Sequence, residues 1–168
     1  PYQAGKPIEE LAREFGLDPK QIVKLASNEN PLGMPESARL AIVAATAQLG
    51  RYPDPAGFDL KQALSARWSV PQNWLTLGNG SNDILELVAS ALLEPGSSVV
   101  YAQHAFVVYR LATQARGARH LVVPAKDFGH DLPAMLEVID DTTRVVFIAN
   151  PNNPTGTYLP NAQLEAFL

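Results

Sequence analysis

The sequence feature that most constrains the fold is an apolar run that ends abruptly at Asn, Pro and Gly. Val145, Val146, Phe147 and Ile148 lead directly into ANPNNPTG, residues 149–156. A run of β-branched and aromatic residues that stops at such residues predicts a buried strand whose carboxyl end opens into a loop. Open α/β sheets bind their ligands at that end of their strands.

Two prolines restrict the backbone of this loop. Because Pro151 and Pro154 limit the conformation of the residue before each of them, we expect a stiff platform from which the amides of Asn152 and Asn153 project. Asn, Pro and Gly also fill ordinary turns for conformational reasons. Residue types alone therefore leave a plain strand exit and a ligand-binding loop equally open.

Strand and helix patterns alternate along the second half of the chain. We expect strands at 74–77, 98–102, 118–123 and 144–149, and helices at 58–68, from about 81 to 92, at 132–139 and from 161. Upstream, we expect a helix at 8–15 that ends at Gly16, a short strand near Lys24, and a helix at 36–49 between Pro35 and Gly50. The alternation predicts right-handed βαβ units, hence an α/β fold with a mainly parallel sheet.

Composition excludes several classes of function. The formal net charge of −4 gives no basic stripe for nucleic acid or an anionic membrane, and no apolar run reaches membrane-spanning length. There is no cysteine, which excludes disulfides and thiolate chemistry and, without a signal-like start, favours the cytoplasm. The three histidines, His104, His120 and His130, lack metal-ligand spacing, and we interpret them as structural or surface residues.

A glycine-containing turn at 78–82 precedes the helix expected from about residue 81. Such a turn presents free N–H groups and the positive end of the helix dipole to an anion, which predicts a phosphate site at Gly80, Ser81 and Asn82. The alternative is that Ser81 or Asn82 only caps the helix. Similarly, Phe106 just after the strand at 98–102 is either a core residue or a flat platform for a ring.

The string NNPTG at a strand end resembles the loop of fold-type I aminotransferases that depend on pyridoxal 5'-phosphate (PLP). The resemblance implies a three-layer αβα large domain in which Asn153 bonds the 3-oxygen of the pyridine ring, Phe106 stacks on that ring, and Gly80, Ser81 and Asn82 hold the phosphate. Two departures stand out. The family usually has an acidic residue where Asn82 stands, and a proline where this chain has Gln103 or His104.

Three further strings, PYQ at the start, NENP at 28–31 and RYPDP at 51–55, are similar to those of the histidinol-phosphate aminotransferase subgroup. The resemblance implies that Tyr2 and Asn28 contact the substrate. It implies that Tyr52 crosses a homodimer interface to the cofactor phosphate of the neighbouring subunit. The implied reaction passes the amino group of histidinol phosphate through PLP to 2-oxoglutarate.

Not every part of such an enzyme is present. In the family, the Schiff-base lysine, the acidic partner of the ring nitrogen and a phosphate-binding arginine follow NNPTG. None of the five lysines, Lys6, Lys20, Lys24, Lys61 and Lys126, has such a context, so we nominate no catalytic residue. The resemblance covers roughly the first half of an aminotransferase. We expect residues 1–50 to be an arm and part of a small domain, and 51–168 to begin the PLP-binding large domain.

The order of strands in the family's sheet also implies that these 168 residues alone would expose two hydrophobic sheet edges, because three strands between 74–77 and 144–149 are lacking. We therefore expect the chain to be part of a longer polypeptide or a complementing assembly, and inactive alone. A monodisperse monomer that melts cooperatively would contradict this. Two alternatives remain: another fold-type I enzyme, such as an aromatic aminotransferase or a threonine-phosphate decarboxylase, or a non-catalytic binding module.

Overall fold

The computed structural model describes residues 5–25 and 27–168, so the predicted substrate contact of Tyr2 lies outside the described residues. The chain divides into two compact units, Pro1–Phe58 and Asp59–Leu168. The predicted domain boundary at residue 50 stays a prediction. Within the described ranges, none of the helices combines the length and the apolar composition that a membrane span requires.

Two helices dominate the first unit. Helix α1 (Ile8–Phe15) ends at Gly16, which adopts the left-handed conformation with φ 65° and donates its N–H to the Ala12 carbonyl, as the sequence predicts. Helix α2 (Glu36–Ala45) follows Pro35 and continues as a 3₁₀ turn at Thr46–Gln48, a tightening that is common at helix ends. The predicted strand at Lys24 is wrong. Leu25 beside it is 91% exposed, and in the described part of this unit no strand lies alongside to pair with it.

A parallel sheet forms the centre of the second unit. Strands β1 (Ser98–Ala102), β2 (Arg119–Val123) and β3 (Thr143–Val146) lie in the order β2-β1-β3, and Val100 is in register with Leu121 and Val146. All three correspond to predicted strands. Although β3 ends at Val146, the Phe147 N–H still donates to the Val100 carbonyl at 2.9 Å, so the pairing of the two strands extends one residue further.

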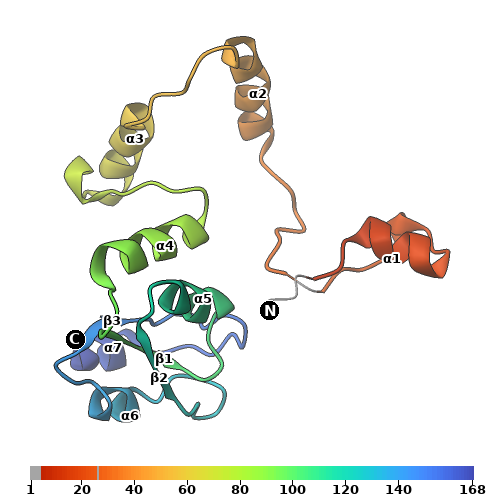
Figure 1. Cartoon of the computed structure of the whole chain (residues 1–168). Coiled ribbons are helices and arrows are strands. Elements are labelled where there is room, and N and C mark those ends of the chain that lie inside the picture. The colour runs from red at the N-terminus through yellow and green to blue at the C-terminus, as the bar shows by residue number, and fades with distance from the viewer. Residues whose placement is uncertain (1–4, 26) are drawn as a thin grey trace. The chain divides into compact units, whose positions relative to one another are not determined.

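Helices cover both faces of this sheet (Figure 1). Helices α4 (Ser81–Leu92) and α5 (Val107–Ala115) share one buried cluster with the sheet, while α6 (Leu132–Glu137) and α7 (Asn161–Phe167) contribute to the other. Val99 and Tyr101 of β1 point into the first cluster, and Val100 points into the second, which is the alternation expected of a strand buried on both sides. The predicted three-layer αβα arrangement is confirmed. Helix α3 (Phe58–Trp68) has the bounds that the sequence predicts.

The predicted strand at residues 74–77 is wrong. Its first residue, Trp74, closes a 3₁₀ helix (Gln72–Trp74) and is 74% exposed, and Leu75 after it is extended. The backbone hydrogen bonds here are local, from Trp74 N to Pro71 O and from Leu75 N to Gln72 O. An extended segment becomes a strand only when a neighbour pairs with it. Among residues 27–168, no strand does so here.

Candidate functional site

The loop that follows β3 is closed by hydrogen bonds from its own residues. The Asn150 side chain donates from Nδ2 to the Leu159 carbonyl at 2.9 Å and accepts at Oδ1 from the Leu159 N–H at 2.8 Å. The Asn152 N–H donates to the Thr157 carbonyl, and the Gly156 N–H donates to the Asn152 carbonyl, both at 2.8 Å. These bonds fix the loop at the carboxyl edge of the sheet, where the sequence predicts a ligand site.

Asn152 does not project from this loop, so that prediction is wrong. The residue is 3% exposed, and its Nδ2 donates to the His104 carbonyl at 2.8 Å and to Thr155 Oγ1 at 2.7 Å. Two acceptors inside the protein compensate the Nδ2 group of this amide for the loss of water. The bond to His104 ties the loop after β3 to the loop after β1. The other amide, on Asn153, is half-buried.

Phe106 stands at the start of α5 with its ring half-buried. The ring meets Tyr109 edge to face, with centroids 6.0 Å apart, and Tyr109 stacks on Phe147 at 4.4 Å. Burial raises the pKa of the Tyr109 hydroxyl above its ordinary value. Phe106 is thus anchored to the core on one side and keeps a partly exposed side. The interpretation as a core residue is confirmed for the side that packs on Tyr109, and the role as a platform for a ring stays a prediction.

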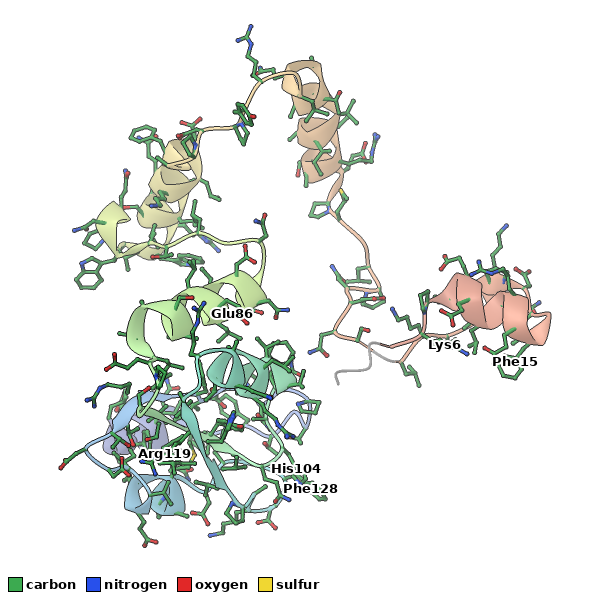
Figure 2. All side chains as sticks on the ribbon, viewed as in Figure 1. Lys6, Phe15, Glu86, His104, Arg119 and Phe128 are labelled. Atoms are coloured by element: carbon green, nitrogen blue, oxygen red, sulfur yellow. The ribbon has the colours of Figure 1, made fainter. Side chains whose placement is uncertain are left out.

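His104, whose carbonyl receives the Asn152 bond, lies beside Phe128 at the rim of this region, with ring centroids 5.5 Å apart (Figure 2). His130 is 7% exposed, and its Nε2 lies 3.0 Å from the Ala149 carbonyl. Its structural role agrees with our interpretation. Asn150 and His130 support the loop without any sign of this in the sequence, because no local pattern shows which backbone group a distant side chain will reach.

The turn before α4 is shaped by backbone conformation. Gly80 is the residue that precedes the helix, with φ 80° and ψ 179°, and no side chain caps the first turn. The alternative that Ser81 or Asn82 only caps the helix is therefore wrong. Asp83 instead accepts bonds at one carboxylate oxygen from the backbone N–H of Asn79 at 2.8 Å and from its side chain at 3.1 Å. The first N–H groups of the helix keep no intrahelical acceptor, which suits an anion.

Five of the predicted cofactor-binding residues belong to the second unit: Gly80, Ser81, Asn82, Phe106 and Asn153. Leu85 and Val88 of α4 pack against the same buried cluster as Phe106, and Asn153 follows the buried Asn152. Among the described residues, the other predicted contacts are Asn28 and Tyr52, which belong to the first unit. Asn28 is exposed, and the Tyr52 side chain is fully exposed. Their roles stay predictions.

This chain matches the family model described as aminotransferase class I and II over residues 20–168. The chain belongs to the class I and II aminotransferase family. The resemblance of the NNPTG loop to this family is thereby confirmed. The three-layer αβα arrangement described above agrees with the fold of the family.

Individual aminotransferases match along the whole chain. It is 69% identical over 168 residues to histidinol-phosphate aminotransferase 1 of Cupriavidus pinatubonensis, covering 45% of that protein. It is 64% identical over the same length to histidinol-phosphate aminotransferase 2 of Ralstonia nicotianae, again covering 45%. The crystal structure of histidinol-phosphate aminotransferase from Sinorhizobium meliloti in complex with pyridoxal-5'-phosphate superimposes with a TM-score of 0.88 at 28% identity, over 98% of this chain and 45% of that one. The chain spans less than half the length of these relatives.

Proposed function

We propose that the protein carrying this chain is a histidinol-phosphate aminotransferase, which transfers an amino group between L-histidinol phosphate and 2-oxoglutarate with PLP as cofactor, in histidine biosynthesis. The observation that carries the proposal is the 69% identity, along all 168 residues, to a protein of that name. The family alone would allow other amino donors, including aromatic amino acids. The similarity along the whole chain favours histidinol phosphate.

The residues at the site fit a phosphorylated pyridine ring. A phosphate needs several N–H donors, and the exposed amino end of α4 offers them together with the positive end of the helix dipole. Gly78 lets the turn close on this helix, because a Cβ there would lie 2.8 Å from the Cβ of Asp83. A flat ring needs an aromatic face and a polar group at its edge. Phe106 and Asn153 provide them from two loops that the Asn152 side chain joins.

Each residue has a distinct role in this proposal. The backbone N–H groups of Ser81 and Asn82 and the Ser81 hydroxyl hold the phosphate, and the Asn153 amide donates to the ring oxygen. Phe106 stacks on the ring, which contributes about 0.5–1.5 kcal/mol and fixes its plane. When bound, PLP supplies the electron sink that the substrate carbon requires. The residues of this chain bind and orient the reactants.

Residues of the first unit complete the proposal. Tyr52 would reach the cofactor phosphate of the neighbouring subunit in a homodimer, and its full exposure leaves the hydroxyl available for that contact. Tyr2 and Asn28 would contact the substrate. We place the enzyme in the cytoplasm. The lysine that forms the Schiff base would lie outside these 168 residues, and the chain alone would not transaminate.

The test is the intact mass of the natural protein, first freed of bound cofactor, after borohydride reduction with PLP added back, beside a sample reduced without PLP added back. We expect a mass well above the 18.2 kDa of this chain and a covalent phosphopyridoxyl group only in the first sample. A protein of 18.2 kDa without the adduct would contradict the proposal and favour a binding module. Assays with histidinol phosphate, phenylalanine and threonine phosphate then decide the substrate, and a preference for either of the last two would contradict our assignment.

A further inference from the structure

We propose that Asn152 is a positioning residue. Its buried amide sets the register of two loops, that is, the position of the loop after β1 relative to the loop after β3. It thereby holds Phe106 and Asn153 on opposite parts of one ligand. This inference rests on the proposed function for the identity of the ligand. The register itself does not depend on the ligand, so it can be measured separately.

The geometry of the amide is determined by its acceptors. Nδ2 donates to the His104 carbonyl at 2.8 Å and to Thr155 Oγ1 at 2.7 Å. If the amide were turned over, its oxygen would face the His104 carbonyl oxygen, and two acceptors would repel each other. Thr155 Oγ1 in turn lies 3.2 Å from Thr157 Oγ1, so the amide is held within a short chain of polar groups. Asn152 can therefore adopt one orientation.

The bond lies where the sheet stops joining the two strands. The pairing of β1 with β3 ends with the bond from Phe147 N to Val100 O. Beyond that point β3 leaves the sheet, while β1 continues to Ala102 in pairing with β2 and then also becomes a loop. Across these two loops the Asn152 amide joins residues 48 positions apart. Adjacent strands alone fix the two loops only where they begin.

The covalent chain carries this register to both predicted ring contacts. Phe106 is two residues after His104, so their Cα atoms are at most about 7.6 Å apart. Asn153 directly follows Asn152, and their Cα atoms lie within about 3.8 Å. A shift of the 104–152 bond therefore moves the stacking ring relative to the amide at the ring oxygen. The Tyr109 contact orients Phe106 against the core, but Asn153 has no such anchor in the described hydrogen bonds.

The two ends of the Asn152 amide differ in their contacts. Oδ1 is buried and has no hydrogen-bond partner among the described residues. Nδ2 makes both hydrogen bonds of the side chain, one to His104 in the loop after β1 and one to Thr155 in the loop after β3. The contact between the two loops therefore depends on the position of Nδ2.

The test compares Asn152→Asp with Thr155→Val in the complete polypeptide that contains this chain. The aspartate keeps the shape of the side chain but places an oxygen against the His104 carbonyl, so we expect amide hydrogen exchange to rise in residues 103–108 and 150–157 together. Thr155→Val removes only the second acceptor, and we expect faster exchange confined to 150–157. Exchange that rises in 150–157 alone for Asn152→Asp, or in neither loop, would overturn the register.

Pyridoxamine 5'-phosphate serves as the second probe, because it cannot form a Schiff base with a lysine and so reports the non-covalent site. We expect its Kd to rise about tenfold or more in Asn152→Asp, with a shifted absorption band of the bound ring, and to change less than twofold in Thr155→Val. An unchanged Kd and band in Asn152→Asp would overturn the positioning role. If the wild-type protein fails to bind this probe, the proposed function fails, while the exchange data still decide the register.

The melting temperature shows whether Asn152→Asp still folds, and a second variant serves as a control. If Asn152→Asp does not fold, Asn152→Ala removes the donor without adding a charge, and the same two readouts apply. A merely structural role would raise exchange throughout β1 and β3 and leave the absorption band of the remaining bound probe unchanged. That result would also overturn the inference.

Discussion

The two segments proposed to hold the cofactor are built in opposite ways. The loop at residues 149–157 is shaped by side chains, with Asn152 buried and Asn150 bonded twice to Leu159. The turn at residues 78–83 is shaped by glycine, since Gly80 adopts φ 80°. A flat ring must be held in one plane by few contacts, which requires fixed side chains. A phosphate accepts bonds from several directions, so a set of backbone N–H groups is sufficient.

The largest effect is expected for Asn150→Ala, which removes both partners of the half-buried Leu159 backbone. We expect a loss of about 3 kcal/mol in the free energy of unfolding, since two polar groups lose their partners. Urea denaturation of the protein measures it. Asn161→Ala at an exposed position is the control and should change stability by less than about 0.5 kcal/mol. Equal results for the two variants would mean that the prolines alone shape the loop.

The next effect tests the glycine turn. Gly80→Ala places a Cβ on a residue with φ 80° and ψ 179°, a region that side chains rarely adopt, at a cost of about 2 kcal/mol in stability. Gly50→Ala is the matched control, because that glycine does not have a positive φ and a Cβ there would meet nothing within 4 Å. It should be neutral or slightly stabilising. If Gly80→Ala behaves like the control, backbone conformation does not shape the turn.

A smaller effect separates binding from folding. Ser81 is exposed, so Ser81→Ala should leave the melting temperature unchanged. It should lower the affinity for pyridoxamine 5'-phosphate about tenfold, or 1.4 kcal/mol, through the loss of one hydroxyl donor to a charged group. Isothermal titration with pyridoxamine 5'-phosphate measures the affinity, and Ser37→Ala, also exposed, is the control. A lower melting temperature with unchanged affinity would assign Ser81 to folding.

The smallest effect concerns pH and lies outside both segments. Burial, with a further contribution from the positive charge of Arg110, lowers the pKa of His120, whose Nδ1 lies 3.0 Å from the Tyr101 hydroxyl. The folded protein therefore binds fewer protons than the unfolded chain. The stability that the protein gains from keeping His120 neutral is present above the pKa of this histidine in the unfolded chain, about 6.5. It is lost as the pH falls through the lower pKa of His120 in the folded protein.

His120→Gln should flatten the decline of stability below about pH 6.5, measured as denaturation midpoints between pH 5 and 8. The loop at 149–157 contains no ionisable side chain, so it gives no reason for such a decline of its own. An unchanged decline in the variant would show that other groups cause it.

Local patterns predicted many elements of the fold. The stop of α1 at Gly16, the bounds of α3 and the three strands of the sheet all follow from apolar spacing and from turn residues. At residues 74–77 the local pattern predicts a strand wrongly, since Trp74 closes a 3₁₀ helix and Leu75 after it is extended but unpaired. Pairing depends on a second segment, and no window of the sequence contains that information.

The family, the position of the strand that leads into NNPTG and the glycine turn before α4 all follow from the amino-acid order, because they depend on residues near each other in the chain. The folded chain was needed to show that Asn152 is buried while Asn153 is half-buried, and that Gly80 directly precedes the first turn of α4. The reason for this difference is that a side chain forms hydrogen bonds with groups that are near it in the folded protein, even when they are distant in the sequence. The carbonyl that fixes Asn152 belongs to His104, 48 residues away.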